Sequence, residues 1–249
     1  MQRLLIFILF FCSQINSMAA TLNSAANNIT NITSQSMSPK KHTISQPKTL
    51  GILLFPGFEI LDAFGPLEMF SIIPDKIKII LIGDVSGTSR TVKSFQGVSV
   101  VVDTNLQNVP HLDILLVPGG MGTRKEVSNP TLLAWIKARS ATAELTLSVC
   151  TGAALLAKAG VLDNHKATSN KIAFEWVKEQ GPKVHWVNKA RWVDDGNIIT
   201  SSGVSAGMDM SLYVISKLYG TAVSEEVAKI TEYNFNADPS DDKFSSSAK

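Results

Sequence analysis

Continuous apolar runs alternate with helix-spaced apolar stretches through the middle of the chain. Unbroken apolar runs are typical of strands that are buried on both faces of a parallel sheet. Four such strands are predicted, at residues 49–55, 77–83, 112–117 and 145–149. Helices are predicted at residues 60–72, 129–139, 150–158, 172–180, 205–218 and 224–233. This alternation predicts an α/β fold, a flavodoxin-like three-layer sandwich with a mainly parallel sheet.

Less regular segments modify this pattern. Alternating valines within residues 91–102 predict short twisted strands. Residues 190–193 and 198–201 flank Asp195-Gly196, a dipeptide that favours a tight hairpin turn. Gly65-Pro66 interrupts the helical periodicity of residues 60–72, so a break is expected there.

The first residues are typical of a secretory signal peptide. Arg3 supplies a short positive region, residues 4–11 an apolar core, and Ser17-Met18-Ala19 a cleavage site with small outer residues. The apolar core is too short to span a bilayer as an ordinary helix, although an uncleaved anchor is the alternative. We therefore expect residues 1–19 to be removed and the protein to be secreted or periplasmic, without stable membrane insertion after cleavage.

The segments at both ends of the remaining chain are polar. Residues 20–48 are rich in Ser, Asn and Thr and predict a disordered linker, which carries glycosylation sequons at Asn28 and Asn31. Residues 239–249 predict a flexible tail. Residues 49–238 are long enough to form one domain with a sizeable core.

The charge balance gives no reason to expect a polyanionic partner. The chain has 23 Lys and Arg against 21 Asp and Glu, a net charge of +2 that becomes +1 when Arg3 leaves with the signal. A charge this small excludes neither enzymes nor binding modules, but it argues against nucleic acid as a partner. The expected partner is a small-molecule substrate.

Cys150 joins the predicted strand 145–149 to the following helix. A glycine two residues later lets the chain turn sharply there, as in a nucleophile elbow. A helix N-terminus stabilises a thiolate, so we expect a nucleophilic Cys150 with a pKa below the free value of about 8.5. The other cysteine, Cys12, lies in the predicted signal, which leaves a single free thiol. The alternative is a small buried apolar residue.

Two further elements are expected beside Cys150, because the carboxyl ends of parallel strands meet at one edge of a sheet. The backbone N–H groups of Gly119-Gly120 and Thr151 are candidates to bind a developing negative charge. Asp62 is the single acid in an apolar stretch after the first strand. We expect it within hydrogen-bond reach of the sulfur, sharing a proton with the thiol and carrying the raised pKa. An ordinary turn and a helix-capping aspartate are the alternatives.

Polar loops at two later strand ends complete the candidate site. Ser169 and Asn170 follow one short predicted extended segment, and Gly203 follows the strand at 198–201. These residues are candidates to bind a substrate. They are alternatively helix caps.

Together these motifs resemble the DJ-1/PfpI (ThiJ) family of the class I glutamine amidotransferase-like superfamily. The resemblance covers roughly residues 50–233 and rests on Leu61-Asp62 with Gly65-Pro66, and on segments 117–120, 148–152 and 201–209. It implies a homodimer, because many relatives build the site close to a subunit boundary. The branch that the chain resembles most contains isonitrile hydratases, which implies catalytic roles for Cys150, Asp62 and Thr151.

The chain lacks the histidine that many relatives carry near residues 168–170. Its four histidines are His42, His111, His165 and His185. A Cys-His-Asp protease or amidase triad is therefore poorly supported, and so is glyoxalase activity. Chemistry without a histidine base is favoured: a lyase in which the thiolate adds to an isonitrile carbon, Asp62 supplies the proton and then activates water, and an N-substituted formamide is released. No metal and no organic cofactor is expected.

A non-enzymatic role is the main alternative. A reactive cysteine beside an acid can stop at the sulfinate when it is oxidised, as expected of a redox or electrophile sensor or a protective protein of the DJ-1 type. A ligand-sensing domain of a transcription regulator is a third hypothesis. The short polar tail and the predicted signal argue against that one.

Overall fold

The computed structural model describes residues 46–85 and 90–245, and its centre is a seven-stranded sheet in the order β10-β11-β7-β6-β1-β2-β5. Neighbouring strands are parallel, except for the antiparallel hairpin of β10 and β11 at one edge. The strands are β1 (Lys48–Leu54), β2 (Ile77–Gly83), β5 (Thr104–Asn105), β6 (Ile114–Val117), β7 (Leu145–Val149), β10 (Trp192–Asp195) and β11 (Ile198–Ser201). Two smaller pairs are β3 (Thr91–Lys93) with β4 (Ser99–Val101), and β8 (Lys166–Ala167) with β9 (His185–Trp186).

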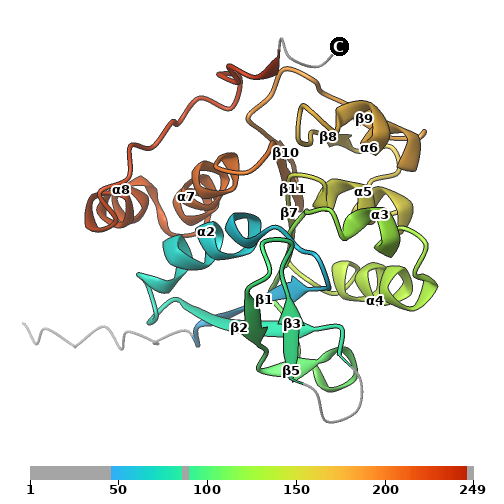
Figure 1. The fold of residues 1–249 in the computed structure, drawn as a ribbon. Coiled ribbons are helices and arrows are strands. Elements are labelled where there is room, and N and C mark those ends of the chain that lie inside the picture. The colour runs from blue at the N-terminus through green and yellow to red at the C-terminus, as the bar shows by residue number, and fades with distance from the viewer. Residues whose placement is uncertain (1–45, 86–89, 246–249) are drawn as a thin grey trace, which may run out of the picture. The chain divides into compact units, whose positions relative to one another are not determined.

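Helices cover both faces of the sheet (Figure 1). One layer consists of α2 (Ile60–Ser71), α7 (Ala206–Tyr219) and α8 (Thr221–Ile230). The opposite layer consists of α3 (Thr123–Glu126), α4 (Pro130–Ser140), α5 (Gly152–Lys158) and α6 (Phe174–Gln180). A 3-10 turn, η1 (Leu106–Asn108), follows β5. The predicted α/β sandwich with a mainly parallel sheet is therefore confirmed.

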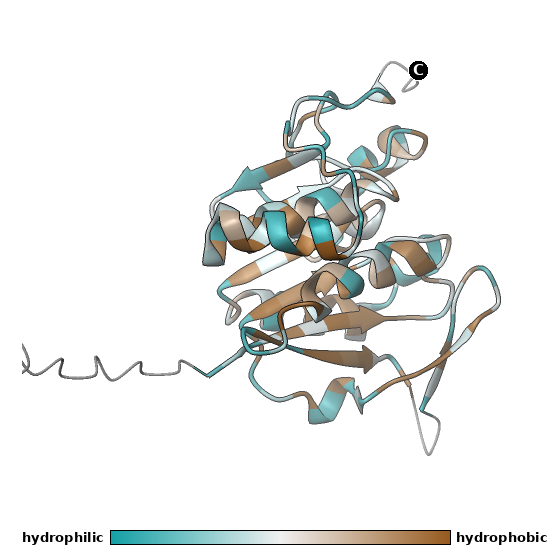
Figure 2. Ribbon diagram, turned by 90° about the vertical axis from the view of Figure 1, so that its left-hand side faces the viewer, coloured by the Kyte–Doolittle hydropathy of each residue, from teal (hydrophilic) through white to brown (hydrophobic). Residues whose placement is uncertain are grey.

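The central strands explain the apolar runs of the sequence. Every residue of β6 and β7 is buried, because these strands lie inside the sheet and have helices on both faces. Figure 2 shows the strands of the sheet largely in brown, with the hydrophilic teal residues gathered on helices and loops. Strands that are buried on both faces therefore have continuous apolar sequences, without the alternating polar residues of a half-exposed strand.

The carboxyl ends of the parallel strands lie at one edge of the sheet. Val117 of β6 pairs in register with Ser148 of β7, and Ser201 of β11 pairs with Val149. The residues that follow these three strands therefore emerge side by side. This edge is where ligands bind in open α/β sheets.

Some elements differ from the expected ones. Helix α2 continues through Gly65-Pro66, and Gly65 packs closely against α7, because a β-carbon at this glycine would lie 2.9 Å from Met208 Cγ. Packing between α2 and α7 thus outweighs the local break. Helix α8 begins at Thr221, before the expected cap at Ser224. Elements β5, β8, β9, η1 and α3 have two to four residues each, too few to produce a periodic pattern.

The two ends of the domain also differ from expectation. Strand β1 begins at Lys48, the last residue of the predicted linker. The segment after Pro239 was expected to be flexible, but Asp242 is 4% exposed and the Arg191 N–H donates to the Pro239 carbonyl at 2.7 Å. The predicted signal at 1–19, most of the linker and residues 246–249 lie outside the described residues. Within the described part of the chain, no helix has the length and apolar character needed to cross a membrane.

Candidate active site

Cys150 lies at the turn between β7 and α5, as predicted for an elbow. Its φ of 56° is in the left-handed region, which non-glycine residues rarely adopt. The Cys150 N–H donates to the carbonyls of Ser201 and Ser202, both at 3.2 Å, and the Ser169 hydroxyl donates to the Cys150 carbonyl at 2.8 Å. Contacts from two other loops therefore hold the strained residue in place.

Gly152 allows helix α5 to begin tightly against the neighbouring strand. A β-carbon at this position would lie 2.1 Å from the carbonyl oxygen of Val117, the last residue of β6. Any larger residue would push the helix away from the sheet. The glycine after the nucleophile thus fixes the elbow against the end of β6.

Asp62 lies in the first turn of α2 and is completely buried. The Gly119 N–H donates to its Oδ2 at 3.0 Å, whereas Oδ1 has no well-formed hydrogen bond to any described residue. Burial raises the pKa of Asp62 from 3.8 to about 8, and the nearby Glu59 carboxylate adds to this shift. The bond from Gly119 and the contact with the Cys150 thiol act in the opposite direction. Asp62 therefore keeps its proton at neutral pH, as predicted.

The Cys150 thiol is 7% exposed and does not have the low pKa that its place at a helix start suggested. Burial raises the pKa of Cys150 well above 9.0, and the negative charge of an ionised Asp62 raises it further. Donation from the Thr151 N–H and hydroxyl lowers the pKa, but the effect is smaller than that of burial. The thiol and the carboxyl interact, and at neutral pH both carry a proton.

The amides of Gly119 and Gly120 face the site, but protein groups already accept their hydrogen bonds. Gly119 donates to Asp62, and the Gly120 N–H donates to Thr151 Oγ1 at 3.0 Å. A β-carbon at Gly119 would lie 2.5 Å from Thr151 N and 2.8 Å from Asp62 Oδ2, so glycine is required here. These amides position the acid and Thr151. The expectation that they are free to bind an oxyanion is therefore wrong.

The three polar loop candidates have different roles. Ser169 is buried and holds the carbonyl of Cys150. Asn170 and Gly203 contact each other, since a β-carbon at Gly203 would meet the Asn170 amide at 2.0 Å. Asn170 Oδ1 also accepts the Ala173 N–H at 3.1 Å, so part of its role is to fold the turn before α6.

Arg124 is a site residue that the sequence did not reveal. Its guanidinium lies 3.8 Å from the centroid of the Trp176 ring, it donates to Thr123 Oγ1 at 3.2 Å, and the Cys150 sulfur acts on its pKa. Burial lowers the pKa of Arg124, and the interaction with Cys150 opposes that shift. A cation in this place stabilises negative charge on the sulfur. Arg124 reaches the site through α3, a helix too short to predict.

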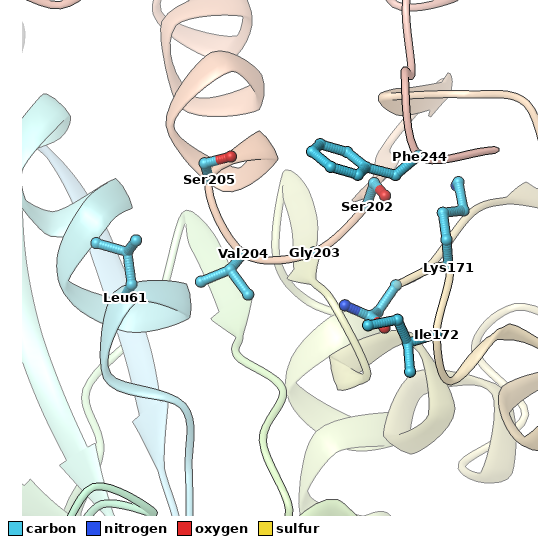
Figure 3. A pocket seen from close by; sticks show the side chains of 9 residues that line it. Leu61, Lys171, Ile172, Ser202, Gly203, Val204, Ser205 and Phe244 are labelled. Atoms are coloured by element: carbon cyan, nitrogen blue, oxygen red, sulfur yellow. The ribbon is translucent and has the colours of Figure 1, made fainter. Parts of the chain in front are cut away.

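A pocket of about 330 Å³ lies beside the elbow, between α2 and the loops after β8 and β11. Figure 3 shows Leu61 on the α2 side, Val204 and Ser205 along the loop before α7, and Ile172 opposite. Phe244, from the C-terminal segment, forms another wall. The remaining lining residues are Asn170, Lys171, Ser202 and Gly203.

The histidines of the domain lie away from Cys150 or make other contacts. His165 Nδ1 lies 2.8 Å from Asp195 Oδ2, and His111 lies 3.6 Å from Asp113 at the surface. Neither contributes to the pKa of Cys150 or Asp62. No group of three or more His, Cys, Asp or Glu side chains in the described ranges could hold a metal ion.

Known proteins resemble this chain over most of the described domain. The DJ-1/PfpI family model matches residues 48–217. An isonitrile hydratase of Pseudomonas putida is 31% identical over 185 residues, which cover 74% of this chain and 78% of that protein. The HTH-type transcriptional regulator GbdR of Pseudomonas aeruginosa is 27% identical over 75% of this chain, which spans about half (51%) of the regulator.

Solved structures show the same fold. A ThiJ/PfpI family protein from Pseudomonas syringae has a TM-score of 0.68 and 29% identity, and the match covers 81% of this chain and 82% of that one. DJ-1beta of Drosophila melanogaster has a TM-score of 0.67 and 25% identity, with coverage of 76% and 100%. The residues matched by the family model include both Asp62 and Cys150.

Proposed function

The chain belongs to the DJ-1/PfpI family, and on that premise we propose that it is a cysteine-dependent lyase that hydrates an isonitrile to an N-substituted formamide. The observation that carries the proposal is the contact between a buried thiol, Cys150, and a buried carboxyl, Asp62, that is protonated at neutral pH. Such a pair combines a nucleophile with an acid and needs no histidine. The similarity to an isonitrile hydratase supports this substrate class.

The burial of the pair favours a slender substrate. Cys150 is 7% exposed and Asp62 is not exposed at all. The reactive carbon of an isonitrile lies at the end of a linear group, so it can approach a sulfur that is nearly covered. A peptide carbonyl carries substituents on both sides and would have to displace the surrounding loops. This argument disfavours protease and amidase activity.

In the first step, sulfur attacks the terminal isonitrile carbon while the Asp62 carboxyl donates its proton to the same carbon. The thiol proton passes to the carboxyl, so a C–S and a C–H bond form and the S–H bond breaks. The product is a thioimidate on Cys150, and Asp62 is again protonated. Because Oδ2 is held by Gly119, Oδ1 is the oxygen left for these transfers.

In the second step, water adds to the carbon of the thioimidate. The carboxyl accepts a proton from the water and donates one to nitrogen. The C–S bond then breaks, the formamide leaves, and sulfur regains its proton. One water is consumed and no electrons are transferred, so no oxidant or reductant is required.

Thr151 and Arg124 support the charge that develops on sulfur. The backbone N–H and the side chain of Thr151 both lower the pKa of Cys150. Arg124 provides a positive charge from the opposite helical layer. Both groups favour the sulfur anion as it forms in the attack and as it leaves the tetrahedral intermediate.

The direct test is formamide production by the purified protein from a panel of alkyl and aryl isonitriles. Wild type is expected to form the N-substituted formamide and to incorporate oxygen from labelled water, whereas Cys150→Ala forms none. Asp62→Asn should form neither the formamide nor a thioimidate adduct on Cys150 in intact-mass spectra, because the first step requires the carboxyl proton. Formamide formation by Cys150→Ala at the wild-type rate, or no formamide from any isonitrile, would contradict the proposal.

One observation favours a second candidate, a redox-responsive protein of the DJ-1 type. Arg124 and the Thr151 donors would stabilise a sulfinate on Cys150 as they stabilise a thiolate. The raised pKa of Cys150 argues against it, because peroxide reacts with the thiolate. Rapid gain of two oxygen atoms by Cys150 in dilute peroxide, without isonitrile turnover, would favour this role.

Assembly and location complete the proposal. We propose a homodimer with a small-molecule substrate and without a nucleic-acid partner, in keeping with the family resemblance. Light scattering at micromolar concentration tests the dimer, and a purely monomeric profile would contradict it. We further propose export of the chain with cleavage after Ala19, tested by fractionation and N-terminal sequencing of the mature protein.

A further inference from the structure

The pocket beside Cys150 is built by loops that also hold the reactive pair. The Ser202 carbonyl accepts the Cys150 N–H, and Ser202 lines the pocket. Leu61 precedes the acid Asp62 in α2, and it also lines the pocket. The cavity of about 330 Å³ therefore shares its lining with the segments that flank the reactive pair, although Cys150 and Asp62 themselves do not line it.

The walls of this pocket are apolar on several sides. Leu61, Ile172, Val204 and Phe244 all present apolar side chains, and they come from four separate segments of the chain (Figure 3). Ile172 is 92% exposed and Phe244 is 60% exposed, although large apolar side chains are usually covered. Exposed apolar groups around a cavity indicate a site that an apolar ligand would cover.

A buried ion pair fixes the segment that carries Phe244. Lys171 Nζ lies 3.1 Å from Asp242 Oδ2, and the two side chains are 2% and 1% exposed. Asp242 Oδ1 accepts the backbone N–H of Phe244 at 2.9 Å. Lys171 also donates to Thr168 Oγ1 at 2.8 Å and to the Ser169 carbonyl at 3.1 Å. The Asp242 carboxylate thus links Lys171, in the loop that also contains Ser169, to the backbone of Phe244.

We propose that this pocket binds the apolar substituent of the substrate, and that Phe244, positioned by the Lys171–Asp242 ion pair, makes the site prefer aryl and cycloalkyl groups over small alkyl groups. The substrate being an isonitrile rests on the function proposed above. The linear C≡N–R unit carries its substituent away from the sulfur and into the neighbouring cavity. Phe244 acts as a specificity-determining residue and Asp242 as a positioning residue.

Phe244→Ala is the first test, with methyl isonitrile and phenyl isonitrile as the two substrates. The variant should lose about tenfold in kcat/KM for the phenyl compound, the size of effect expected for lost apolar contacts, and change less than twofold for the methyl compound. Phe95→Ala is a matched control, since Phe95 is 58% exposed and lies in the β3–β4 hairpin. An unchanged ratio between the two substrates in Phe244→Ala would overturn the proposal.

A second measurement separates the pocket from the reaction. N-Methylmaleimide and N-phenylmaleimide alkylate a thiol whether or not the protein hydrates isonitriles. The quantity measured is the rate of alkylation by the phenyl reagent divided by the rate with the methyl reagent. This ratio should be higher for Cys150 in the wild type than for a free thiol in solution, and Phe244→Ala should lose the difference. If the preference is present and no isonitrile is hydrated, the pocket stands and the proposed function fails. If isonitriles are hydrated without any dependence on Phe244, the pocket proposal fails alone.

The positioning role of Asp242 requires a variant pair. In Asp242→Asn the amide oxygen can accept from Phe244 or face Lys171, but it cannot do both, so the phenyl preference should fall as in Phe244→Ala. The double variant should show no greater loss of preference than either single variant, because both changes act through the same ring. Additive losses would show that Asp242 does not act through Phe244. Methyl isonitrile turnover reports whether each variant is folded.

Discussion

Asp62 and Asp209 occupy comparable places in the fold but have different surroundings. Each lies in the first turn of a helix, α2 or α7, and these two helices pack on the same face of the sheet. Both carboxyls are completely buried. Asp209 forms an ion pair with Arg191 and accepts the Asn236 N–H at 2.9 Å. Among the described residues, no cation forms an ion pair with Asp62, and its partners are one backbone N–H and the Cys150 thiol.

This difference distinguishes Asp209, a carboxyl with a structural role, from Asp62, the acid of the candidate active site. A buried carboxylate that faces a guanidinium has its charge compensated, and it ties two segments together. A buried carboxyl without a cation keeps its proton, because desolvation disfavours the charged form. Burial alone therefore does not mark the acid of a site. The absence of a compensating cation around Asp62, among the residues that the structure describes, is the informative feature.

The largest expected contrast is in activity. Asp62→Asn should lower kcat/KM for isonitrile hydration by about 10²–10⁴-fold, the range for loss of a general acid. Asp209→Asn should leave kcat/KM of the folded protein within about twofold. If that variant does not fold, Arg191→Met with Asp209→Leu replaces the ion pair with apolar side chains of similar volume. Equal losses in the Asp62 and Asp209 variants would remove the distinction between the two carboxyls.

The same pair of substitutions should change stability in opposite directions. At pH 7 ionisation of Asp62 lowers the free energy of the unfolded chain, whereas the folded chain keeps the carboxyl protonated. Asp62→Asn removes this difference and should raise the free energy of unfolding by about 4 kcal/mol at most. Asp209→Asn leaves Arg191 without a counter-charge in a mostly buried place and should destabilise by about 3 kcal/mol. Urea unfolding at pH 7 measures both.

The pH dependence of the free energy of unfolding tests whether the pKa of Asp62 is raised or lowered by folding. The folded pKa of Asp62 is raised, so the wild type loses stability relative to Asp62→Asn as pH rises from about 4 to about 8. Below and above this window the difference should be constant. A difference that does not vary between pH 4 and 8 would mean that Asp62 ionises normally in the fold.

The pH profile of activity is the next smaller effect. The first step requires a protonated Asp62, whose pKa is about 8. We therefore expect kcat/KM to be flat from about pH 6 to 7.5 and to fall up to tenfold per pH unit above 8. A rate that rises through pH 8–9 would indicate that a free thiolate attacks without the acid. The profile of Asp209→Asn should follow that of the wild type.

The sequence was sufficient to predict the sheet and the elbow. Long apolar runs mark β6 and β7, which are buried throughout, and also β1 and β2, although Lys78 in β2 is exposed. Cys150 was placed at the turn by the change from an apolar run to small residues. Asp62 stood out as an acid in an apolar stretch, and the sequence alone gave its raised pKa as an expectation.

Other features depend on contacts between distant segments, which a local pattern does not contain. Burial of the thiol and the neighbouring Asp62 carboxyl, which comes from α2, raise the pKa of Cys150, so the expected low value was wrong. The Gly119 and Gly120 amides were expected to be free, but side chains from α2 and the elbow accept their bonds. Lys171 and Asp242 are 71 positions apart (242 − 171), and nothing in either segment identifies the other as its partner.

The smallest expected effect concerns the cation beside the thiol. Arg124 is partly exposed, so solvent screens its charge and its influence on Cys150 is modest. Arg124→Gln should slow iodoacetamide labelling of Cys150 at pH 8 by about threefold, because the thiolate loses a stabilising charge. Arg139→Gln is the matched control: it removes the same charge from a guanidinium that also lies near a tryptophan ring, 5.7 Å from the centroid of Trp135 in α4. Equal slowing in both variants would show that net charge, and not the position of Arg124, governs the thiol. Slowing in Arg124→Gln alone would show that the position of Arg124, and not the net charge of the protein, governs the reactivity of the Cys150 thiol.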